Sequence, residues 1–228
     1  MIKIEDIEVM GMRKAIKGMR NAMNSWDKSD SGYMVDEKLD GVQFSYFKIG
    51  EKDMKLCKNL IKAGSPDRKF MRMIHVQADV TAPLYWWKEF DTYKVGTVAN
   101  SCSTMHTLHK RDLTLDDFSH ENLISDSVDI LKDLINTLND CRDSYINYDK
   151  DINLITKEIT SKKHIWWQMI QLLPSSFNQM RTIDLNYETL FSIYHQRKGH
   201  KLDEWREFCK WIETLPYMKQ FLNLEDKV

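Results

Sequence analysis

Three stretches of this chain, far apart in the sequence, have the residue pattern of strands, and helical patterns fill much of the sequence between them. "IKIEDIEVM" at residues 2–10 and "FMRMIHVQADV" at 70–80 alternate apolar and polar residues, and "SFNQMRTIDLN" at 176–186 has the same strand-like character. A period of two places every second side chain on one face of a sheet, so the first two stretches are expected to form strands with one buried face, and the third is expected to form a strand. Long helices interleaved with a few strands predict an α+β fold.

Helical periodicity is strongest in the second half of the chain. Apolar residues at Ile124, Val128, Leu131, Ile135 and Leu138 form one stripe, which predicts a long helix over about residues 121–147. A further long helix is predicted over about residues 151–172, where the proline of "LLP" ends it. Shorter helices are predicted over residues 11–23, 51–64, 187–197 and 201–213, and Gly64 is the expected C-cap of the second of these. Pro83 suits the first turn of a short helix through the tryptophans that follow it.

The remaining segments are polar or irregular. "NSWDKSDSGYMVDEKLDG" at residues 24–41 is predicted to be a loop rich in turn residues. No internal repeat, low-complexity segment or linker interrupts the chain, so a single domain over residues 1–228 is predicted.

Composition argues against several classes of function, although a local anion site remains open because one or two arginines can hold a phosphate. The formal net charge of -1 gives no general electrostatic reason to expect nucleic acid or an anionic membrane as a partner. No run approaches the roughly 20 apolar residues that a membrane span needs. The N-terminal residues lack the basic-then-apolar order of a signal peptide, so a cytoplasmic location is expected.

Cysteines and histidines do not form a metal-binding pattern. The four cysteines include no C-x-x-C pair, which argues against a disulfide framework or a structural zinc site. His106 and His109 could share a helix face, but no carboxylate or cysteine follows at a matching spacing. No metal site is therefore predicted.

The most informative region is C-terminal, "LPSSFNQMRTIDLNYETLFSIYHQRKGHKLDEWREF". Asn186 follows Pro174 by twelve residues, Arg197 follows Asn186 by eleven, and Glu204 comes near the start of the last predicted helix. In these intervals the chain resembles the flavin-dependent thymidylate synthases. "VMG" at Val9–Gly11, "RNAMNSW" from Arg20 and the helix, glycine turn and strand that end at residue 80 agree in order with the same family.

The resemblance implies a flavin-dependent thymidylate synthase-like fold, in which a small sheet is flanked by long helices. It also implies a homotetramer that binds FAD and dUMP at subunit interfaces. In that family reduced flavin delivers a hydride, methylenetetrahydrofolate supplies the methyl carbon, and NADPH reduces the flavin. Such chemistry needs a fixed cation for the nucleotide phosphate, polar contacts to the uracil edge and a dry wall against the isoalloxazine.

Two residues keep the family spacing and carry expected roles. Arg197 is expected to bind the nucleotide, since a guanidinium suits a phosphate or a pyrimidine carbonyl, or else to satisfy the carbonyls at a helix end. Asn186 is expected to contact the flavin or ribose, or to cap the helix that begins near Tyr187, and the two roles are compatible.

The chain departs from the family between Trp86 and His106. The family signature begins with Arg-His-Arg and continues through a serine, an Asn-Glu pair, a second serine and an Arg-Tyr. Aligned without gaps, Lys88, Glu89 and Phe90 replace Arg-His-Arg, Val95–Gly96 replace Asn-Glu, Val98 replaces the second serine, and Asn100–Ser101 replace Arg-Tyr.

An insertion gives a second alignment of the same stretch. Asn100 then matches the asparagine, Ser101 stands for the glutamate, Ser103 matches the second serine, and Met105–His106 replace Arg-Tyr. The helix before "LLP" has Ile170 where the family has a nucleotide-binding arginine, and "GSPDRKF" lacks the flavin-contacting histidine, although Arg68 is near.

The candidate site residues follow from the two alignments. Ser103 and Ser101 are the catalytic candidates, although no base follows at a spacing that would activate a hydroxyl. Asn186, Lys88 and Asn100 are the cofactor-binding candidates, and Arg197 is the substrate-binding candidate. Trp86 and Trp87 either wall a flavin or pack in the core.

Two leading classes of function remain open from the sequence, and a third, an unrelated helical binding protein, would require the C-terminal spacing to be a coincidence. The first is a flavoenzyme that methylates dUMP or acts on a related pyrimidine nucleotide. The second is a non-catalytic homologue that keeps the fold and the oligomer interface without flavin or substrate. The retained Asn186 and Arg197 favour the first, and the missing signature arginines favour the second.

Overall fold

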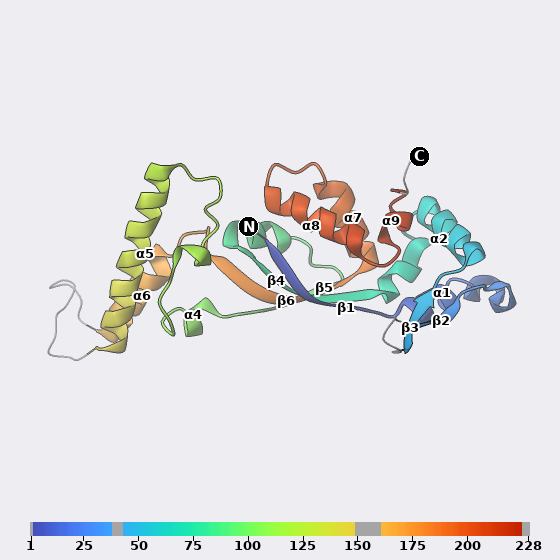
Figure 1. Cartoon of the computed structure of the whole chain (residues 1–228), viewed down its shortest axis with the longest axis horizontal. Coiled ribbons are helices and arrows are strands. Elements are labelled where there is room, and N and C mark those ends of the chain that lie inside the picture. The colour runs from blue at the N-terminus through green and yellow to red at the C-terminus, as the bar shows by residue number, and fades with distance from the viewer. Residues whose placement is uncertain (1, 38–42, 149–160, 225–228) are drawn as a thin grey trace. The chain divides into compact units, whose positions relative to one another are not determined.

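A four-stranded sheet contains the three stretches with the strand pattern. Its strands are β1 (Lys3–Met10), β4 (His75–Pro83), β6 (Asn178–Asn186) and β5 (Thr97–Ser101), side by side in the order β1-β4-β6-β5 (Figure 1). In β4 the side chains alternate as predicted, because Val76, Ala78 and Val80 are buried while the residues between them are partly exposed. Mixed helix and sheet confirms the predicted α+β class.

The computed structural model describes residues 2–37, 43–148 and 161–224. The chain divides into two compact units, each assembled from three stretches of sequence. The first unit comprises Met1–Lys3, Asp79–Thr92 and Asn100–Thr182, and the second comprises Ile4–Ala78, Tyr93–Ala99 and Ile183–Val228. The single domain over residues 1–228 stays a prediction.

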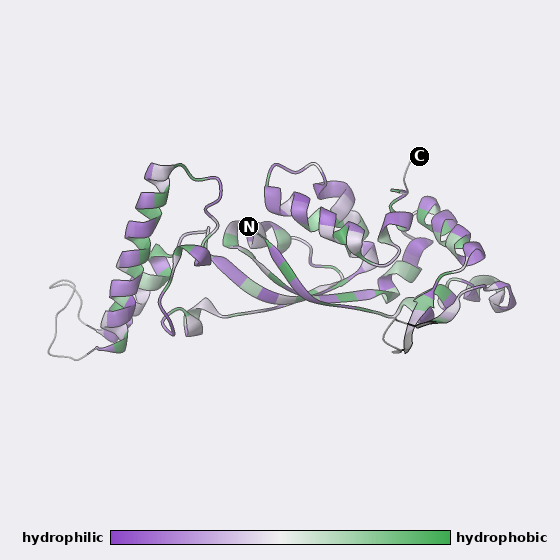
Figure 2. Ribbon diagram, in the orientation of Figure 1, coloured by the Kyte–Doolittle hydropathy of each residue, from purple (hydrophilic) through white to green (hydrophobic). Residues whose placement is uncertain are grey.

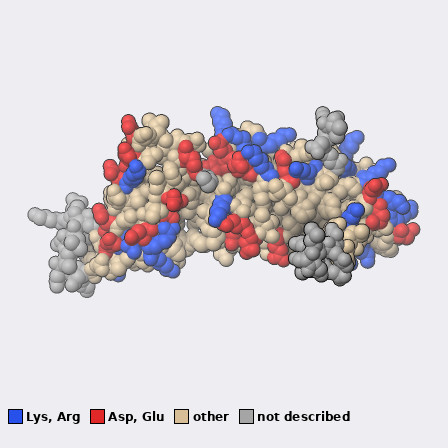
Figure 3. All heavy atoms as spheres, in the orientation of Figure 1, with Lys and Arg blue, Asp and Glu red and all other residues tan. Residues whose placement is uncertain are grey.

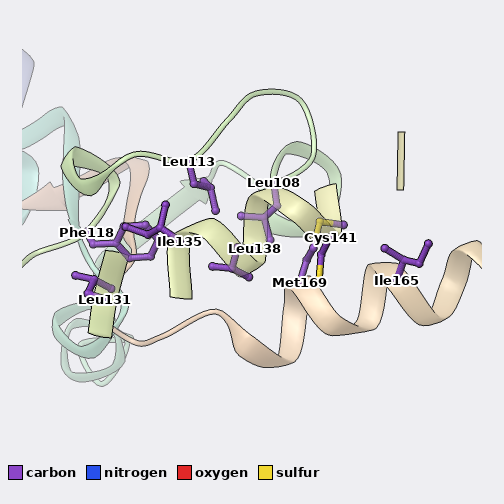
Figure 4. Close-up of a cluster of buried hydrophobic side chains, with 9 residues drawn as sticks. All are labelled: Leu108, Leu113, Phe118, Leu131, Ile135, Leu138, Cys141, Ile165 and Met169. Atoms are coloured by element: carbon purple, nitrogen blue, oxygen red, sulfur yellow. The ribbon is translucent and has the colours of Figure 1, made fainter. Parts of the chain in front are cut away.

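Two long helices dominate the first unit. The predicted stripe forms α5 (Ser125–Ile146), and its ribbon shows alternating hydrophilic and hydrophobic bands (Figure 2). Leu131, Ile135 and Leu138 pack with Ile165 and Met169 of α6 (Lys162–Leu172) in a buried cluster (Figure 4). This cluster confirms the centre of the stripe. Ile124, the first residue of the predicted stripe, does not belong to the buried face, because it precedes the helix as its N-cap residue and is exposed.

The first unit also holds three short helices, α3 (Leu84–Phe90), α4 (Thr104–Thr107) and the 3-10 turn η4 (Leu115–Asp117). Pro83 stands immediately before α3 as its N-cap residue, one position earlier than predicted. The predicted helix over residues 151–172 is confirmed from Lys162 onward, and its first part lies outside the described residues.

Helices also surround the core of the second unit. They are α1 (Met12–Gly18), α2 (Glu51–Ala63), α7 (Tyr187–Arg197), α8 (Asp203–Thr214) and α9 (Met218–Phe221), with the 3-10 turns η1 (Asn21–Met23), η2 (Trp26–Lys28) and η3 (Arg68–Met73). Tyr187 and Leu190 of α7 and Trp205 of α8 are fully buried, and the Tyr187 hydroxyl donates to the Pro216 carbonyl over 2.9 Å. Gly64 follows α2 at a φ of 114°, a conformation that glycine adopts without strain, so the predicted glycine stop is confirmed.

Three local predictions differ from the structure. The helix expected over residues 11–23 ends at Gly18 and gives way to η1, and the strand expected from Phe70 begins at His75 because residues 68–73 form η3. The loop expected at residues 24–41 contains β2 (Gly32–Glu37), which pairs antiparallel with β3 (Gln43–Lys48) in a separate two-stranded sheet. Residues 32–35 and 45–48 of this hairpin are exposed or only partly buried, so this part of the sequence carries little apolar alternation.

Basic and acidic side chains are mixed across the face shown in Figure 3. This mixture agrees with the near-zero net charge of the chain. No helix in the described part of the chain is both long enough and apolar enough to cross a membrane.

Candidate functional site

The six predicted site residues fall into two groups. Lys88 lies on α3, Asn100 and Ser101 end β5, and Ser103 stands just before α4, all in the first unit. Asn186 and Arg197 mark the two ends of α7 in the second unit. Eleven helical residues rise roughly 16 Å along the axis, so Asn186 and Arg197 do not meet.

The first group is polar and accessible. Lys88, Asn100 and Ser101 are exposed, and Ser103 is half-buried. The hydroxyls of Ser101 and Ser103 form no hydrogen bond with any residue that the structure describes, whereas the Ser103 carbonyl accepts bonds from His106 and Thr107 at the start of α4. In the described chain, therefore, no base prepares either hydroxyl as a nucleophile.

A polar network that the sequence did not predict lies beside this group. Arg181 of β6 donates to Asp91 over 2.7 Å and to the side chain of Gln179 over 3.0 Å. Gln179 in turn donates to the backbone carbonyl of Cys102 over 2.8 Å, and the Arg181 guanidinium lies 4.3 Å from the Trp87 ring centroid. The network fixes the backbone just after Asn100 and Ser101 to β6.

Trp86 and Trp87 belong to the core. Both are 0% exposed, and Trp86 stacks on Phe90 with ring centroids 5.1 Å apart at 27°. Trp87 donates its indole N–H to the Gln179 carbonyl over 2.8 Å. Rings without exposed surface cannot wall a flavin, so the packing alternative is confirmed.

In the second unit, Asn186 caps α7. Its side-chain oxygen accepts the backbone N–H of Thr189 over 2.9 Å, which confirms the capping alternative. Gly96 lies against it at a φ of 70°, and a Cβ on Gly96 would stand 2.3 Å from Asn186 Nδ2. Thr189 Oγ1 also donates to the carbonyl of Val95 over 3.2 Å. The stretch that replaces the family's Asn-Glu pair in one alignment thus packs directly on the start of α7.

Arg197 sits among aromatic rings. Its Nε–H donates to the Tyr93 hydroxyl over 2.8 Å, and its guanidinium carbon lies 4.8 Å from the Trp205 ring centroid. Tyr93 donates to the side chain of Gln196 over 3.0 Å. These contacts fix the guanidinium plane at the end of α7, and the side chain remains half-buried.

A second charged cluster lies at the other end of the same helix. Arg68 Nε contacts both carboxylate oxygens of Glu188, over 3.0 and 2.9 Å, and Ser65 donates to the same carboxylate over 3.0 Å. The Arg68 guanidinium carbon lies 4.7 Å from the Phe191 ring centroid, and that ring also meets His195. Burial, together with the positive charges of Lys198 and Arg68, lowers the pKa of His195.

Sequence reasoning missed these partners because they are distant along the chain. Asp91 and Arg181 are separated by 90 residues, and Arg68 and Glu188 by 120. A third such set joins Asp184 of β6 to His75 and Gln77 of β4 over 2.8 and 2.9 Å. Only the strand pattern of the stretches around residues 75 and 184 signalled that these side chains belong to one sheet.

No cluster of three or more potential metal ligands occurs among the residues that the structure describes. His109, one of the two histidines considered as ligands, lies against Tyr145 with ring centroids 5.0 Å apart.

Two solved structures share this fold over nearly the whole chain. A crystal structure of thymidylate synthase X (ThyX) from Helicobacter pylori with FAD and dUMP aligns with a TM-score of 0.63 and 13% identity, covering 97% of each chain. A structure of flavin-dependent thymidylate synthase ThyX from Helicobacter pylori, complexed with FAD and dUMP, gives a TM-score of 0.62 and 14% identity over 96% of this chain and 97% of that one. No protein-family model and no curated protein sequence matches the chain.

At this low identity the likeness concerns the fold alone. The chain has the fold of the flavin-dependent thymidylate synthases, as the C-terminal spacing predicted.

Proposed function

We propose that this chain is a flavin-dependent thymidylate synthase-like protein that binds FAD and a pyrimidine nucleotide, and that it methylates dUMP or acts on a related pyrimidine nucleotide. The observation that carries this function is the fold shared over 97% of both chains with a protein whose structure holds FAD and dUMP. In its cytoplasmic setting the bound flavin would supply the hydride, with methylenetetrahydrofolate and NADPH as co-substrates.

The donor groups of the described residues fit the polar parts of such ligands. Lys88 is an exposed cation, and Asn100 and Ser101 expose an amide and a hydroxyl. A phosphate needs the first kind of group, and a ribose or a uracil edge needs the second. We assign Lys88, Asn100 and Asn186 to the cofactor and Ser101 and Ser103 to the reacting end of the nucleotide.

Arg197 is assigned to the nucleotide. The Tyr93 hydroxyl and the Trp205 ring hold its guanidinium in one orientation, and a fixed planar donor loses little freedom when it binds a phosphate or a pyrimidine carbonyl.

The apolar wall for the isoalloxazine has to come from residues other than Trp86 and Trp87, which are fully buried. Val95 and Val98 are 88% and 69% exposed and belong to the stretch that replaces the family signature. Exposed valines next to polar ligand groups are suited to covering one face of a ring.

A non-catalytic homologue is the second candidate function, and a specific observation favours it. Three arginines around the predicted residues already have protein partners: Arg68 has Glu188, Arg181 has Asp91, and Arg197 has Tyr93 and Trp205. A guanidinium that is engaged by protein partners in this way has fewer donors left for a ligand phosphate.

Flavin binding separates the two candidates. Purified protein, titrated with FAD, is expected to quench the flavin fluorescence and to melt at a higher temperature, because a ligand that binds only the folded state stabilises it. Colourless protein with neither quenching nor a thermal shift would exclude the flavoenzyme function and would leave the fold unaffected.

The role of Arg197 is tested by dUMP binding to the FAD-loaded protein. Arg197→Ala is expected to weaken binding by about tenfold or more, as loss of a charge-assisted contact costs about 1.5–3 kcal/mol. Lys210→Ala, which removes an exposed cation from α8, serves as the control and is expected to bind like the unmodified chain. Equal affinities of Arg197→Ala and the unmodified chain would take Arg197 out of the nucleotide site.

A further inference from the structure

A pocket in the second unit shares no residue with the site assigned above. It lies between α1 and the β2–β3 hairpin, which appear next to each other in Figure 1, and has a volume of about 200 Å³. Arg13, Ile16, Lys17 and Arg20 line one side of it. Their spacing of three, four and seven residues puts all four on the same face of α1 and its extension.

Aromatic rings line another part of the pocket. They are Trp26 of η2, Tyr33 of β2 and Phe47 of β3. Trp26 is 46% exposed, yet its indole is held by a 2.8 Å hydrogen bond to the Asn21 side chain. Tyr33 is 63% exposed and meets Phe47, its direct partner across the hairpin, edge-on at 5.6 Å. Large rings that are both exposed and fixed form a surface prepared for another flat group.

A buried carboxylate, both of whose oxygens accept hydrogen bonds, joins the segments around the pocket. Asp53 is 0% exposed, and one of its oxygens accepts from Arg20 over 2.6 Å. The other accepts from the hydroxyls of Ser29 and Ser31, each over 2.6 Å. The loop that carries these serines is thereby tied to Asp53 of α2 and, through Asp53, to Arg20 just after α1.

The charge of the lining is one-sided. Arg13, Lys17 and Arg20 line the pocket, and no carboxylate is among the lining residues that the structure describes. Asp53 neutralises Arg20, whereas Arg13 and Lys17 are exposed and form no ion pair within the described chain. Two cations on neighbouring turns of one helix therefore face the pocket next to the aromatic wall.

We propose that this pocket binds a small aromatic anion. The planar ring packs against Trp26 and Tyr33, and the anionic group, a phosphate or a carboxylate, is held by Arg13 and Lys17. Rings bury well against fixed aromatic side chains, and a charge-assisted contact adds affinity and orientation. Neither FAD nor dUMP binding at the other site is needed for this pocket.

Calorimetric titration of the full chain tests the pocket with two probes that share this chemistry. Adenosine 5′-monophosphate carries a phosphate, and indole-3-acetate carries a carboxylate. At least one probe is expected to bind, and the one that binds identifies the anionic group. Adenosine and inorganic phosphate, each of which has half of the recognised features, are expected to bind at least about tenfold more weakly.

Variants assign the binding to this pocket rather than to any other nucleotide site. The double variant Arg13→Gln/Lys17→Gln is expected to lower the affinity by about tenfold or more and to remove most of its salt dependence. Lys14→Gln, an exposed cation on the same helix that does not line the pocket, is the matched control and is expected to bind normally. Three results would each contradict the proposed binding of an aromatic anion. They are the failure of both probes to bind, inorganic phosphate binding as tightly as the best probe, and an unchanged affinity in the double variant.

Discussion

Gly96 shows how strongly a single residue can be constrained. Its φ of 70° belongs to the left-handed region, and the space where a Cβ would lie is filled by Asn186 Nδ2 at 2.3 Å and Thr189 Oγ1 at 3.0 Å. A glycine is required there for both conformation and space, because the stretch after Tyr93 must lie flat on the cap of α7. In the ungapped alignment the glycine stands where the family has the glutamate of its signature.

Gly96→Ala is expected to lower the free energy of unfolding by about 2–4 kcal/mol, from left-handed strain together with overpacking. Chemical denaturation of the variant measures the loss. Gly199→Ala is the control, because nothing lies within 4 Å of a Cβ at that position. Equal losses in the two variants would contradict the close packing of Gly96 on Asn186.

His195 makes stability depend on pH. Burial, and then the charges of Lys198 and Arg68, lowers its folded-state pKa below the ordinary value of 6.5. As the pH falls through 6.5, the unfolded chain takes up the proton before the folded chain does, so acidification destabilises the fold. The stabilisation is fully present above pH 6.5 and is lost as the pH falls through the lowered pKa.

His195→Gln is expected to reduce this loss of stability between neutral and mildly acidic pH. Melting temperatures of the variant and the unmodified chain, compared across that range, measure the effect. Parallel curves for the two proteins would show that His195 does not titrate differently on folding.

At the scale of helices, α5 and α6 depend on each other through one apolar seam. Leu138 is 1% exposed and lies in the cluster that joins α5 to Ile165 and Met169 of α6. Leu138→Ala is expected to cost about 2–5 kcal/mol of stability, since the removed atoms leave a cavity that neighbouring side chains fill only in part. Denaturant unfolding followed by circular dichroism measures the cost.

Asn136→Ala provides the comparison on the same helix. Asn136 is exposed on α5, and its replacement is expected to change stability by less than about 0.5 kcal/mol. A Leu138→Ala loss as small as this would mean that the seam contributes little to the stability of the first unit.

Elements with a strong repeat were predictable from the sequence. The alternation around His75 and the stripe through Leu131 and Leu138 gave β4 and α5 because one face of each is buried. β5 was missed since four of its five residues are exposed, and the β2–β3 hairpin was missed for a similar reason. In strands like these, pairing comes from backbone hydrogen bonds, which leave no apolar pattern in the sequence.

The candidate site was predictable to a smaller extent. The capping alternative for Asn186 was predictable because asparagine is favoured at the position just before a helix. The partners of Arg197, Arg68 and Arg181 were not recognised, since pairing between residues roughly a hundred positions apart depends on how the elements assemble. The spacing of residues in the sequence indicated the fold, whereas the protein partners of each guanidinium were visible only in the structure.

For the whole molecule, the resemblance and the surface favour assembly. Ile124, Ile130 and Val95 are 71%, 70% and 88% exposed, and we propose that contacts between subunits cover them. Light scattering is expected to give a homotetramer, with four times the chain mass of 27.1 kDa. A particle with the mass of one chain would leave the exposed apolar residues without the proposed subunit contacts.

The three-stretch make-up of each unit has a consequence for genetic manipulation of this protein. No continuous fragment of the chain contains one unit without part of the other, because residues 93–99 interrupt the first unit and residues 79–92 and 100–182 separate parts of the second. A terminal truncation that removes the whole of one unit therefore also removes residues of the other. Functional dissection has to rely on point substitutions, since deletion cannot yield one unit alone.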